Sequence, residues 1–202
     1  MIVRMIDRVM QTRRPRALWA AAAFVGAIGL APANAASPQE RIAICAGCHG
    51  EDGNSKIEKI PSLAGQPAFF VLNSLFLMRE GVRKVDAMVP FVKDLTDEEL
   101  DALSRHYAAL PAKASDEKAD AALAQKGAAI ATQRGCVSCH LPTLAGQQQM
   151  PRVAKQRIDY LTPTLKSYRD APRPGADTAM SAAIAGATDD DIAALANFAA
   201  SK

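Results

Sequence analysis

The 202-residue chain keeps all four of its cysteines in two pentapeptides of the form Cys-x-x-Cys-His, at residues 45–49 and 136–140. Two residues between the cysteines place both thiols on one turn of chain, where they can add to neighbouring vinyl groups of one porphyrin. The histidine that follows can ligate the iron. The spacing predicts two covalently bound c-type haems (heme c), attached through Cys45, Cys48, Cys136 and Cys139, with His49 and His140 as iron ligands.

Paired cysteines also occur in other kinds of site. Two Cys-x-x-Cys pairs supply enough ligands for one zinc ion, and a single pair can form a redox-active dithiol. Zinc ligation does not explain why a histidine follows each pair, or why no cysteine lies elsewhere. A dithiol of the thioredoxin type needs a βαβ pattern, which the sequence lacks. Zinc and dithiol chemistry remain as alternatives to haem.

Residues 1–35 have the features of a secretory signal peptide. Five arginines precede a short apolar stretch that ends at Leu30, and residues 33–35 read Ala-Asn-Ala, which is an A-x-A cleavage site. The apolar stretch is shorter than the ~20 residues that a membrane-spanning helix needs. The sequence therefore predicts export of a mature chain that begins at Ala36.

Removal of this segment changes the charge of the chain. The whole sequence carries 24 Lys and Arg against 21 Asp and Glu, but residues 36–202 carry 19 against 20. Such a near-neutral chain lacks the basic excess of nucleic-acid-binding proteins, so no nucleic-acid partner is expected. Residues 36–112 are acidic on balance and residues 113–202 are basic. This asymmetry either orients the protein toward a charged partner or is ordinary surface charge.

The two halves of the mature chain are tandem repeats with an offset of 90 to 92 residues. His49 corresponds to His140, and Gln66 corresponds to Gln156. A second Leu-Ala-Gly-Gln sequence, at residues 144–147, lies too close to the second pentapeptide to match the first. We therefore prefer the longer register.

Each repeat is predicted to be mostly helical. Residues 37–40 form a capping box that opens a helix running into the first pentapeptide. Ser115 is expected to start a longer helix that continues to Gln133. A middle helix follows each matched glutamine, and the last helices open on capping boxes at Thr96 and Thr188.

No segment has a persuasive strand pattern, so the expected fold class is all-α. We place an N-terminal domain at residues 36–112 and a C-terminal domain at residues 113–202, joined at a short linker. Aromatic residues make up only 5% of the chain, which is little for two small cores. A covalently fixed haem in each domain would supply a further apolar body for side chains to pack against.

The repeat also indicates the sixth ligand of each iron. His106 is the one histidine outside the pentapeptides. Met88 and Met180 occupy matching positions in loop-like surroundings before the last helices, whereas Met78 falls on an apolar helix face and Met150 has no counterpart. We expect Met88 and Met180 to ligate iron, with core packing as their alternative role. His106 is expected to pack or to lie at the surface. A thioether opposite histidine raises the reduction potential.

The mature chain resembles the dihaem cytochrome c4 family along nearly its whole length. The resemblance rests on residues 45–55 (CAGCHGEDGNS), residues 61–66 (PSLAGQ) and residues 95–100 (LTDEEL). It implies two class I cytochrome c folds, each around one haem, with haem edges that approach each other. It also implies that the carbonyl groups of Pro61 and Pro151 accept hydrogen bonds from the haem histidines. The second repeat lacks the Gly-x-x-Gly-Asn that follows the first motif.

The family resemblance implies a carrier of single electrons rather than an enzyme. Such a protein acts in the periplasm, takes electrons from a quinol-oxidising complex and gives them to a terminal oxidase or reductase. Peripheral association with a membrane is compatible with this role. The alternative is an electron-accepting subunit of a periplasmic dehydrogenase, of the flavocytochrome sulfide dehydrogenase or alcohol dehydrogenase type. A dihaem peroxidase needs a haem with an open position, which the paired methionines argue against.

Overall fold

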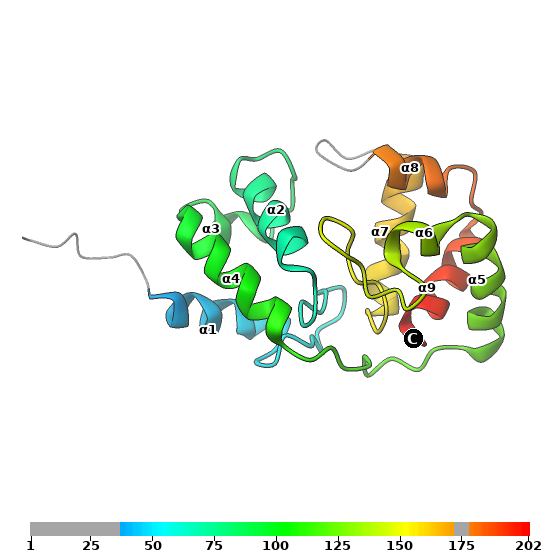
Figure 1. Cartoon of the computed structure of the whole chain (residues 1–202), viewed down its shortest axis with the longest axis horizontal. Coiled ribbons are helices and arrows are strands. Elements are labelled where there is room, and N and C mark those ends of the chain that lie inside the picture. The colour runs from blue at the N-terminus through cyan, green and yellow to red at the C-terminus, as the bar shows by residue number, and fades with distance from the viewer. Residues whose placement is uncertain (1–36, 172–177) are drawn as a thin grey trace, which may run out of the picture. The chain divides into compact units, whose positions relative to one another are not determined.

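Helices form the regular structure of both repeats (Figure 1). The computed structural model describes residues 37–171 and 178–202, and the expected signal peptide lies outside these residues. Within the described ranges the regular elements are α-helices, and a single isolated bridge pairs Gln147 with Met150. The all-α prediction is confirmed.

The first repeat contains four helices, and two of them begin where the sequence predicts. Ser37 caps the first helix, because its hydroxyl accepts from the Glu40 amide and its own amide donates to the Glu40 carboxylate. Thr96 and Glu99 form the same capping box before the last helix. The short third helix was not expected. The helices are α1 (Pro38–His49), α2 (Ala68–Arg79), α3 (Val89–Val92) and α4 (Asp97–Ala109).

The second repeat divides its first helical segment in two. Gly135, at a φ of 70°, ends one helix and precedes a short second helix that carries the haem motif. Thr188 opens the last helix with the predicted capping box. The helices are α5 (Ala121–Gln133), α6 (Cys136–His140), α7 (Ile158–Asp170), α8 (Thr178–Ile184) and α9 (Asp189–Ala200).

The predicted start of α5 at Ser115 is wrong. Asp120 caps α5, and its carboxylate accepts from the Leu123 amide at 2.9 Å. Glu117 instead accepts from the amides of residues 158 and 159, at 2.7 and 3.0 Å. These amides lie in the first turn of α7 and have no partner within the helix. The acidic residue that resembles a local cap therefore caps a helix about 40 residues further along the chain.

Backbone hydrogen bonds confirm the longer repeat register. The amides of residues 63 and 64 both donate to the Gly53 carbonyl, and the amides of residues 153 and 154 both donate to the Leu144 carbonyl. Gly53 and Leu144 both have positive φ, 72° and 56°. Leu144 therefore takes the place of Gly53. The second repeat makes the same turn with a leucine in a conformation that costs a non-glycine residue roughly 1–2 kcal/mol.

Each repeat has its own hydrophobic core, although residues 36–202 form one compact unit. In the first repeat α2 packs on α4, and the core includes Leu100, Leu103 and Tyr107. In the second repeat α5 crosses α9 closely, because Gly127 has no side chain to hold the two backbones apart. Ile192 lies fully buried in that second core.

Candidate functional site

Each haem motif ends in a buried histidine whose ring is held by a proline carbonyl. His49 is the last residue of α1 and His140 the last of α6. The Nδ1 atoms of these rings lie 2.8 Å from the carbonyl oxygens of Pro61 and Pro151 respectively. Because a carbonyl oxygen only accepts, Nδ1 carries the proton. Nε2 is then the ring nitrogen that can ligate iron.

Burial shifts the pKa of three residues of the haem motifs. It lowers the pKa of His49, against the opposing effect of the hydrogen bond to Pro61. The ring is therefore neutral near pH 7, as an iron ligand must be. Burial also raises the pKa of the Cys45 and Cys136 thiols. A redox-active dithiol needs a thiolate with a lowered pKa, so the surroundings of these cysteines argue against that alternative.

The four cysteines form no disulfide bond with one another and lie in two separate pairs. Cys45 and Cys136 are half-buried, whereas Cys48 and Cys139 are exposed. Among residues 37–171 and 178–202, no three or more His, Cys, Asp or Glu side chains converge in a group able to hold a metal ion. A structural zinc site would need the two pairs to meet around one point. The pairs instead belong to different repeats.

The structure brings Met88 to the same core as the first haem motif. Met88 lies at the N-terminus of α3, and both Met88 and Cys45 pack against the core of the first repeat. Val89 and Phe91, which follow Met88 in α3, are 44% and 45% exposed. Ile44, next to the first thiol, is 49% exposed. Exposed apolar side chains thus lie close in sequence both to Met88 and to the first thiol.

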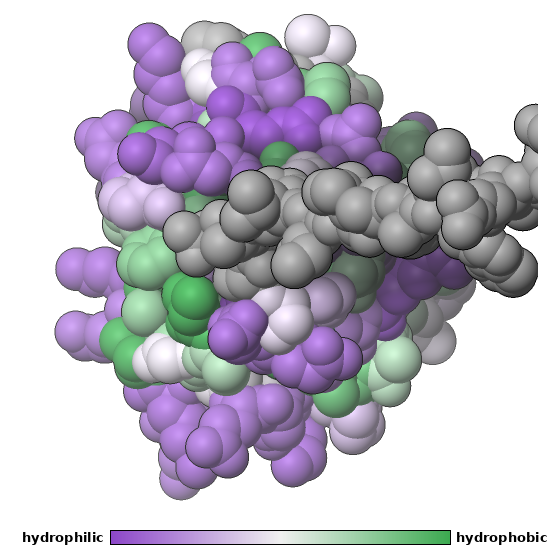
Figure 2. Space-filling model, turned by 90° about the vertical axis from the view of Figure 1, so that its left-hand side faces the viewer, coloured by the Kyte–Doolittle hydropathy of each residue, from purple (hydrophilic) through white to green (hydrophobic). Residues whose placement is uncertain are grey.

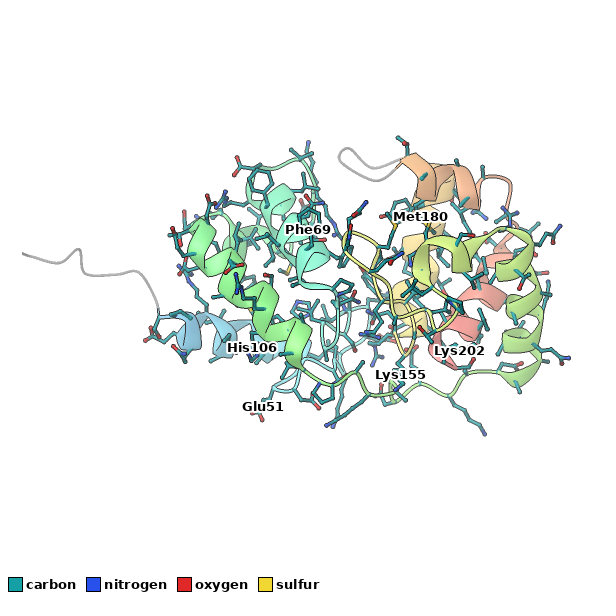
Figure 3. The ribbon with its side chains drawn as sticks, viewed as in Figure 1. Glu51, Phe69, His106, Lys155, Met180 and Lys202 are labelled. Carbon is teal, nitrogen blue, oxygen red and sulfur yellow. The ribbon has the colours of Figure 1, made fainter. Side chains whose placement is uncertain are left out.

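Met180 lies in α8, so the expected loop setting is wrong for this residue (Figure 3). The segment from Thr178 to Ile184 is rich in alanine, which favours helix over loop. Met180 is half-buried. It is not among the described residues that pack against the second core, whereas Cys136 is. Residues 172–177, which lead into α8, lie outside the described part of the chain.

The remaining sulfur and imidazole groups occupy other positions. Met78 lies in α2 and packs against the first core. Met150 lies in the bridge with Gln147. His106 lies in α4, with its ring centroid 5.1 Å from that of Tyr107 (Figure 3). Its Nε2 atom is buried and has no hydrogen-bond partner within the described residues.

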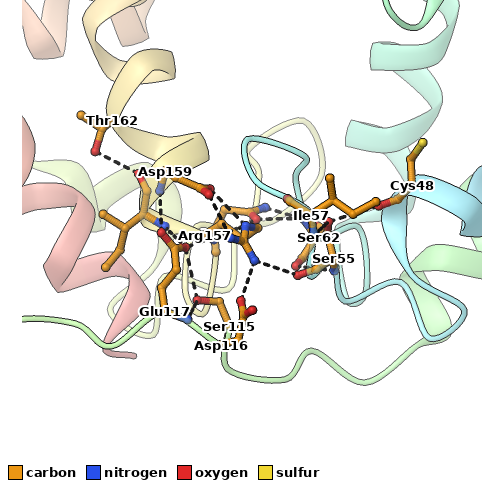
Figure 4. A network of polar contacts seen from close by, with 12 residues as sticks. Cys48, Ser55, Ile57, Ser62, Ser115, Asp116, Glu117, Arg157, Asp159 and Thr162 are labelled. Atoms are coloured by element: carbon orange, nitrogen blue, oxygen red, sulfur yellow. Dashed lines mark hydrogen bonds and ion pairs between the residues drawn. The ribbon is translucent and has the colours of Figure 1, made fainter.

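Polar side chains that no sequence pattern predicted join the two repeats (Figure 4). Arg157, whose side chain is 5% exposed, donates to the Ser55 carbonyl at 3.3 Å, to Asp116 at 2.6 Å and to both carboxylate oxygens of Asp159. Arg152 is also buried and donates to backbone carbonyl groups of both repeats. Burial lowers its pKa to about 10.

Two glutamines that occupy matching positions in the repeats also join them, and the sequence alignment of the repeats identifies this pair. Gln66 bonds the backbone of Arg152, and Gln156 bonds the backbone of Ser62. The repeat alignment pairs these glutamines, although nothing in it shows that each one faces the opposite repeat.

The exposed large apolar side chains of the described residues all belong to the first repeat. Figure 2 shows apolar side chains among polar ones on one face of the molecule. The exposed large apolar residues of the first repeat are Ile44, Ile57, Phe69, Phe76, Val82, Val89 and Phe91.

Comparison with known proteins identifies the family. The model of the family described as cytochrome c matches residues 124–201, and that described as cytochrome C oxidase, cbb3-type, subunit III matches residues 34–106. Cytochrome c4 of Pseudomonas aeruginosa is 30% identical over 187 residues, which cover 86% of this chain and 92% of that protein. The chain belongs to the cytochrome c4 family. The resemblance inferred from the sequence is therefore confirmed.

A solved structure of a cytochrome c4 and a further curated relative are also similar to this chain. The structure of reduced recombinant cytochrome c4 from Pseudomonas stutzeri matches with a TM-score of 0.73 and 28% identity, over 82% of this chain and 97% of that chain. The thiosulfate dehydrogenase electron acceptor of Stutzerimonas stutzeri is 32% identical over 76% of each protein.

Family membership and the two motifs establish the cofactor content of the chain. Like cytochrome c4, it carries two covalently bound haem c groups, one in each cytochrome c domain, and it is a dihaem electron-transfer cytochrome. Its homologues are redox electron-transfer proteins that act with other redox proteins. Within residues 37–171 and 178–202, no helix has the length and apolar character needed to cross a membrane.

Proposed function

We propose that this cytochrome is a periplasmic carrier of single electrons between a quinol-oxidising complex and a terminal oxidase or reductase. The observation that carries the proposal is the duplicated histidine geometry, with Nδ1 of each ring 2.8 Å from a proline carbonyl. When bound, each haem c supplies an iron that gains and loses one electron. Two ligands held in the same way give the chain two such centres, and the signal peptide predicted at residues 1–35 provides the export route.

Met88 and Met180 are the proposed sixth ligands, opposite His49 and His140. A thioether is a soft and neutral ligand that favours reduced iron. The chain also fixes each imidazole, because the ring is buried and its Nδ1 is hydrogen-bonded. A fixed ring limits the rearrangement that accompanies a change of charge on the metal. Such a site suits electron transfer better than reaction with small molecules.

Replacement of single methionines tests the ligand assignment. Met88→Leu and Met180→Leu should each lower one reduction potential by at least about 59 mV, which is tenfold in the redox equilibrium, and leave the other unchanged. Each variant should also lose part of the near-infrared absorption of the oxidised protein. Met78→Leu and Met150→Leu are the matched controls and should change neither property. If Met88→Leu and Met180→Leu leave both potentials unaltered, the ligand assignment is wrong.

A second candidate function is that of an electron-accepting subunit in a larger dehydrogenase. It is favoured by the 32% identity to a relative named thiosulfate dehydrogenase electron acceptor. Chromatography of the native protein from its host distinguishes the two. A carrier elutes alone and is reduced by a purified quinol-oxidising complex. A subunit co-elutes with a flavoprotein or another dehydrogenase and is reduced only by that partner's substrate.

A further inference from the structure

The two matched glutamines bind equivalent backbone groups in opposite repeats. Gln66 Nε2 donates to the Arg152 carbonyl at 2.9 Å, and Gln66 Oε1 accepts from the Arg152 amide at 3.0 Å. Gln156 Nε2 donates to the Ser62 carbonyl at 2.9 Å, and Gln156 Oε1 accepts from the Ser62 amide at 2.8 Å. Ser62 and Arg152 follow the matched prolines of the two repeats. Each repeat therefore makes the same contact with the other.

The amides in these contacts belong to the peptide groups that hold the haem histidines. The nitrogen of Ser62 is bonded to the carbonyl carbon of Pro61, whose oxygen lies 2.8 Å from His49 Nδ1. The nitrogen of Arg152 is joined in the same way to Pro151, whose oxygen holds the second histidine. One peptide group thus makes two hydrogen bonds, one as a donor and one as an acceptor. A glutamine of the other repeat accepts from its N–H, and a histidine of its own repeat donates to its C=O.

Hydrogen bonds on the two sides of one peptide group strengthen each other. An acceptor on the N–H side polarises the peptide and makes its carbonyl a better acceptor. The effect needs a site from which water is excluded. Gln66, Gln156, Ser62 and Arg152 meet this requirement, with 3%, 2%, 1% and 5% of their surfaces exposed. A stronger bond to Nδ1 increases the basicity of the imidazole toward iron.

We propose that Gln66 tunes the haem of the second repeat and Gln156 tunes the haem of the first. Both act as positioning residues through the peptide that holds the opposite histidine. The inference rests on the proposed function, because it requires His49 and His140 as iron ligands. A more basic imidazole stabilises oxidised iron, so loss of a glutamine raises the potential of the haem in the opposite repeat.

The two sites differ in one respect. Gln156 Oε1 also accepts from the amide of Arg157, at 3.0 Å, so it is shared between two donors. No second donor to Gln66 Oε1 is present among the described residues. Among these residues, Gln66 Oε1 therefore accepts only the hydrogen bond from the Arg152 amide. Replacement of Gln66 should have the larger effect of the two.

Gln66→Leu and Gln156→Leu in the mature dihaem protein test the crossed effect. Gln66→Leu should shift the redox equilibrium of the second haem by about two- to fourfold, which is about 18–36 mV, and leave the first haem unchanged. Gln156→Leu should shift the first haem and leave the second unchanged. Nuclear magnetic resonance during a redox titration assigns each potential to its haem. Each variant serves as the control for the other. Equal shifts of both haems, or shifts confined to the glutamine's own repeat, would overturn the inference.

A measurement on the wild-type protein reports the hydrogen bonds without any substitution. In the reduced, diamagnetic protein, scalar coupling should link the Ser62 amide nitrogen to the side-chain carbonyl carbon of Gln156, and the Arg152 amide nitrogen to that of Gln66. Absence of both couplings would overturn the inference.

If a leucine variant does not mature, the unbranched replacement Gln66→Met or Gln156→Met takes its place. If both haems have histidine ligands but the glutamine substitutions change neither reduction potential, this inference fails while the proposed function stands.

Discussion

Arg157→Met should destabilise the protein more than any loss of a surface charge. The guanidinium has a side chain only 5% exposed, binds both oxygens of Asp159 and also binds Asp116 and the Ser55 carbonyl. Removal of one partner from a buried ion pair costs about 3–5 kcal/mol. Asp159 and Asp116 have 19% and 55% exposed side chains, so water replaces part of what they lose. We expect a loss of about 2–4 kcal/mol in the free energy of unfolding.

Arg105→Met is the matched control. Arg105 also pairs with an aspartate, Asp101, at 2.9 Å, but its side chain is 75% exposed. Exposed pairs of this i,i+4 type contribute about 0.3–0.5 kcal/mol. Denaturant unfolding of both variants, followed by circular dichroism and haem absorbance, gives the two differences. Equal destabilisation by the two substitutions, or a loss below about 1 kcal/mol for Arg157→Met, would show that burial does not make the ion pairs of Arg157 stronger than the exposed pair of Arg105.

Arg157→Met should also change how the free energy of unfolding depends on pH. Burial raises the pKa of Asp159, but hydrogen bonds and the positive charge of Arg157 have the opposite and larger combined effect. The pKa of Asp159 therefore lies below its ordinary value. A carboxylate with a lowered pKa in the folded state contributes stability above its unfolded pKa of about 3.9. That contribution is lost as pH falls through the folded pKa. Arg157→Met should therefore flatten the loss of stability in acid.

Two further substitutions test the helix crossing and the linker. Gly127→Ala places a Cβ atom 2.6 Å from the carbonyl carbon of Ala194. This steric overlap should cost more than the ~1 kcal/mol of helix propensity that alanine gains, so the melting temperature should fall. An unchanged or higher melting temperature would contradict this packing. Lys113 bonds Asp52 at 2.7 Å and holds its pKa at about 2. In Lys113→Met the pKa of Asp52, measured by carboxyl ¹³C titration, should rise toward about 3.9, with a stability change below about 1 kcal/mol because the pair is exposed.

Local signals and internal repetition made much of the architecture predictable. The capping boxes at Ser37, Thr96 and Thr188 each satisfy amide groups within three residues, so sequence alone fixes where those helices begin. The family resemblance implies that the carbonyl groups of Pro61 and Pro151 accept hydrogen bonds from the haem histidines. The structure places both at hydrogen-bond distance from the histidine rings.

Features that depend on distant partners were not predictable in this way. Glu117 has the sequence setting of a local cap, yet its carboxylate binds amides at the start of α7. Arg157 and the glutamines act across the junction of the repeats, and no local pattern reports which backbone they meet. Met180 was expected in a loop because prolines precede it, but alanines around it favour the helix α8.

We propose that one histidine and one methionine of each repeat ligate its iron. Nuclear magnetic resonance of the reduced protein, labelled at its methionine methyl groups, tests this claim most directly, because the ring current of a haem strongly shifts the methyl group of an axial methionine. We predict two such shifted signals, which disappear one at a time in Met88→Leu and Met180→Leu. A single shifted signal, none, or one that disappears in Met78→Leu or Met150→Leu would contradict the account.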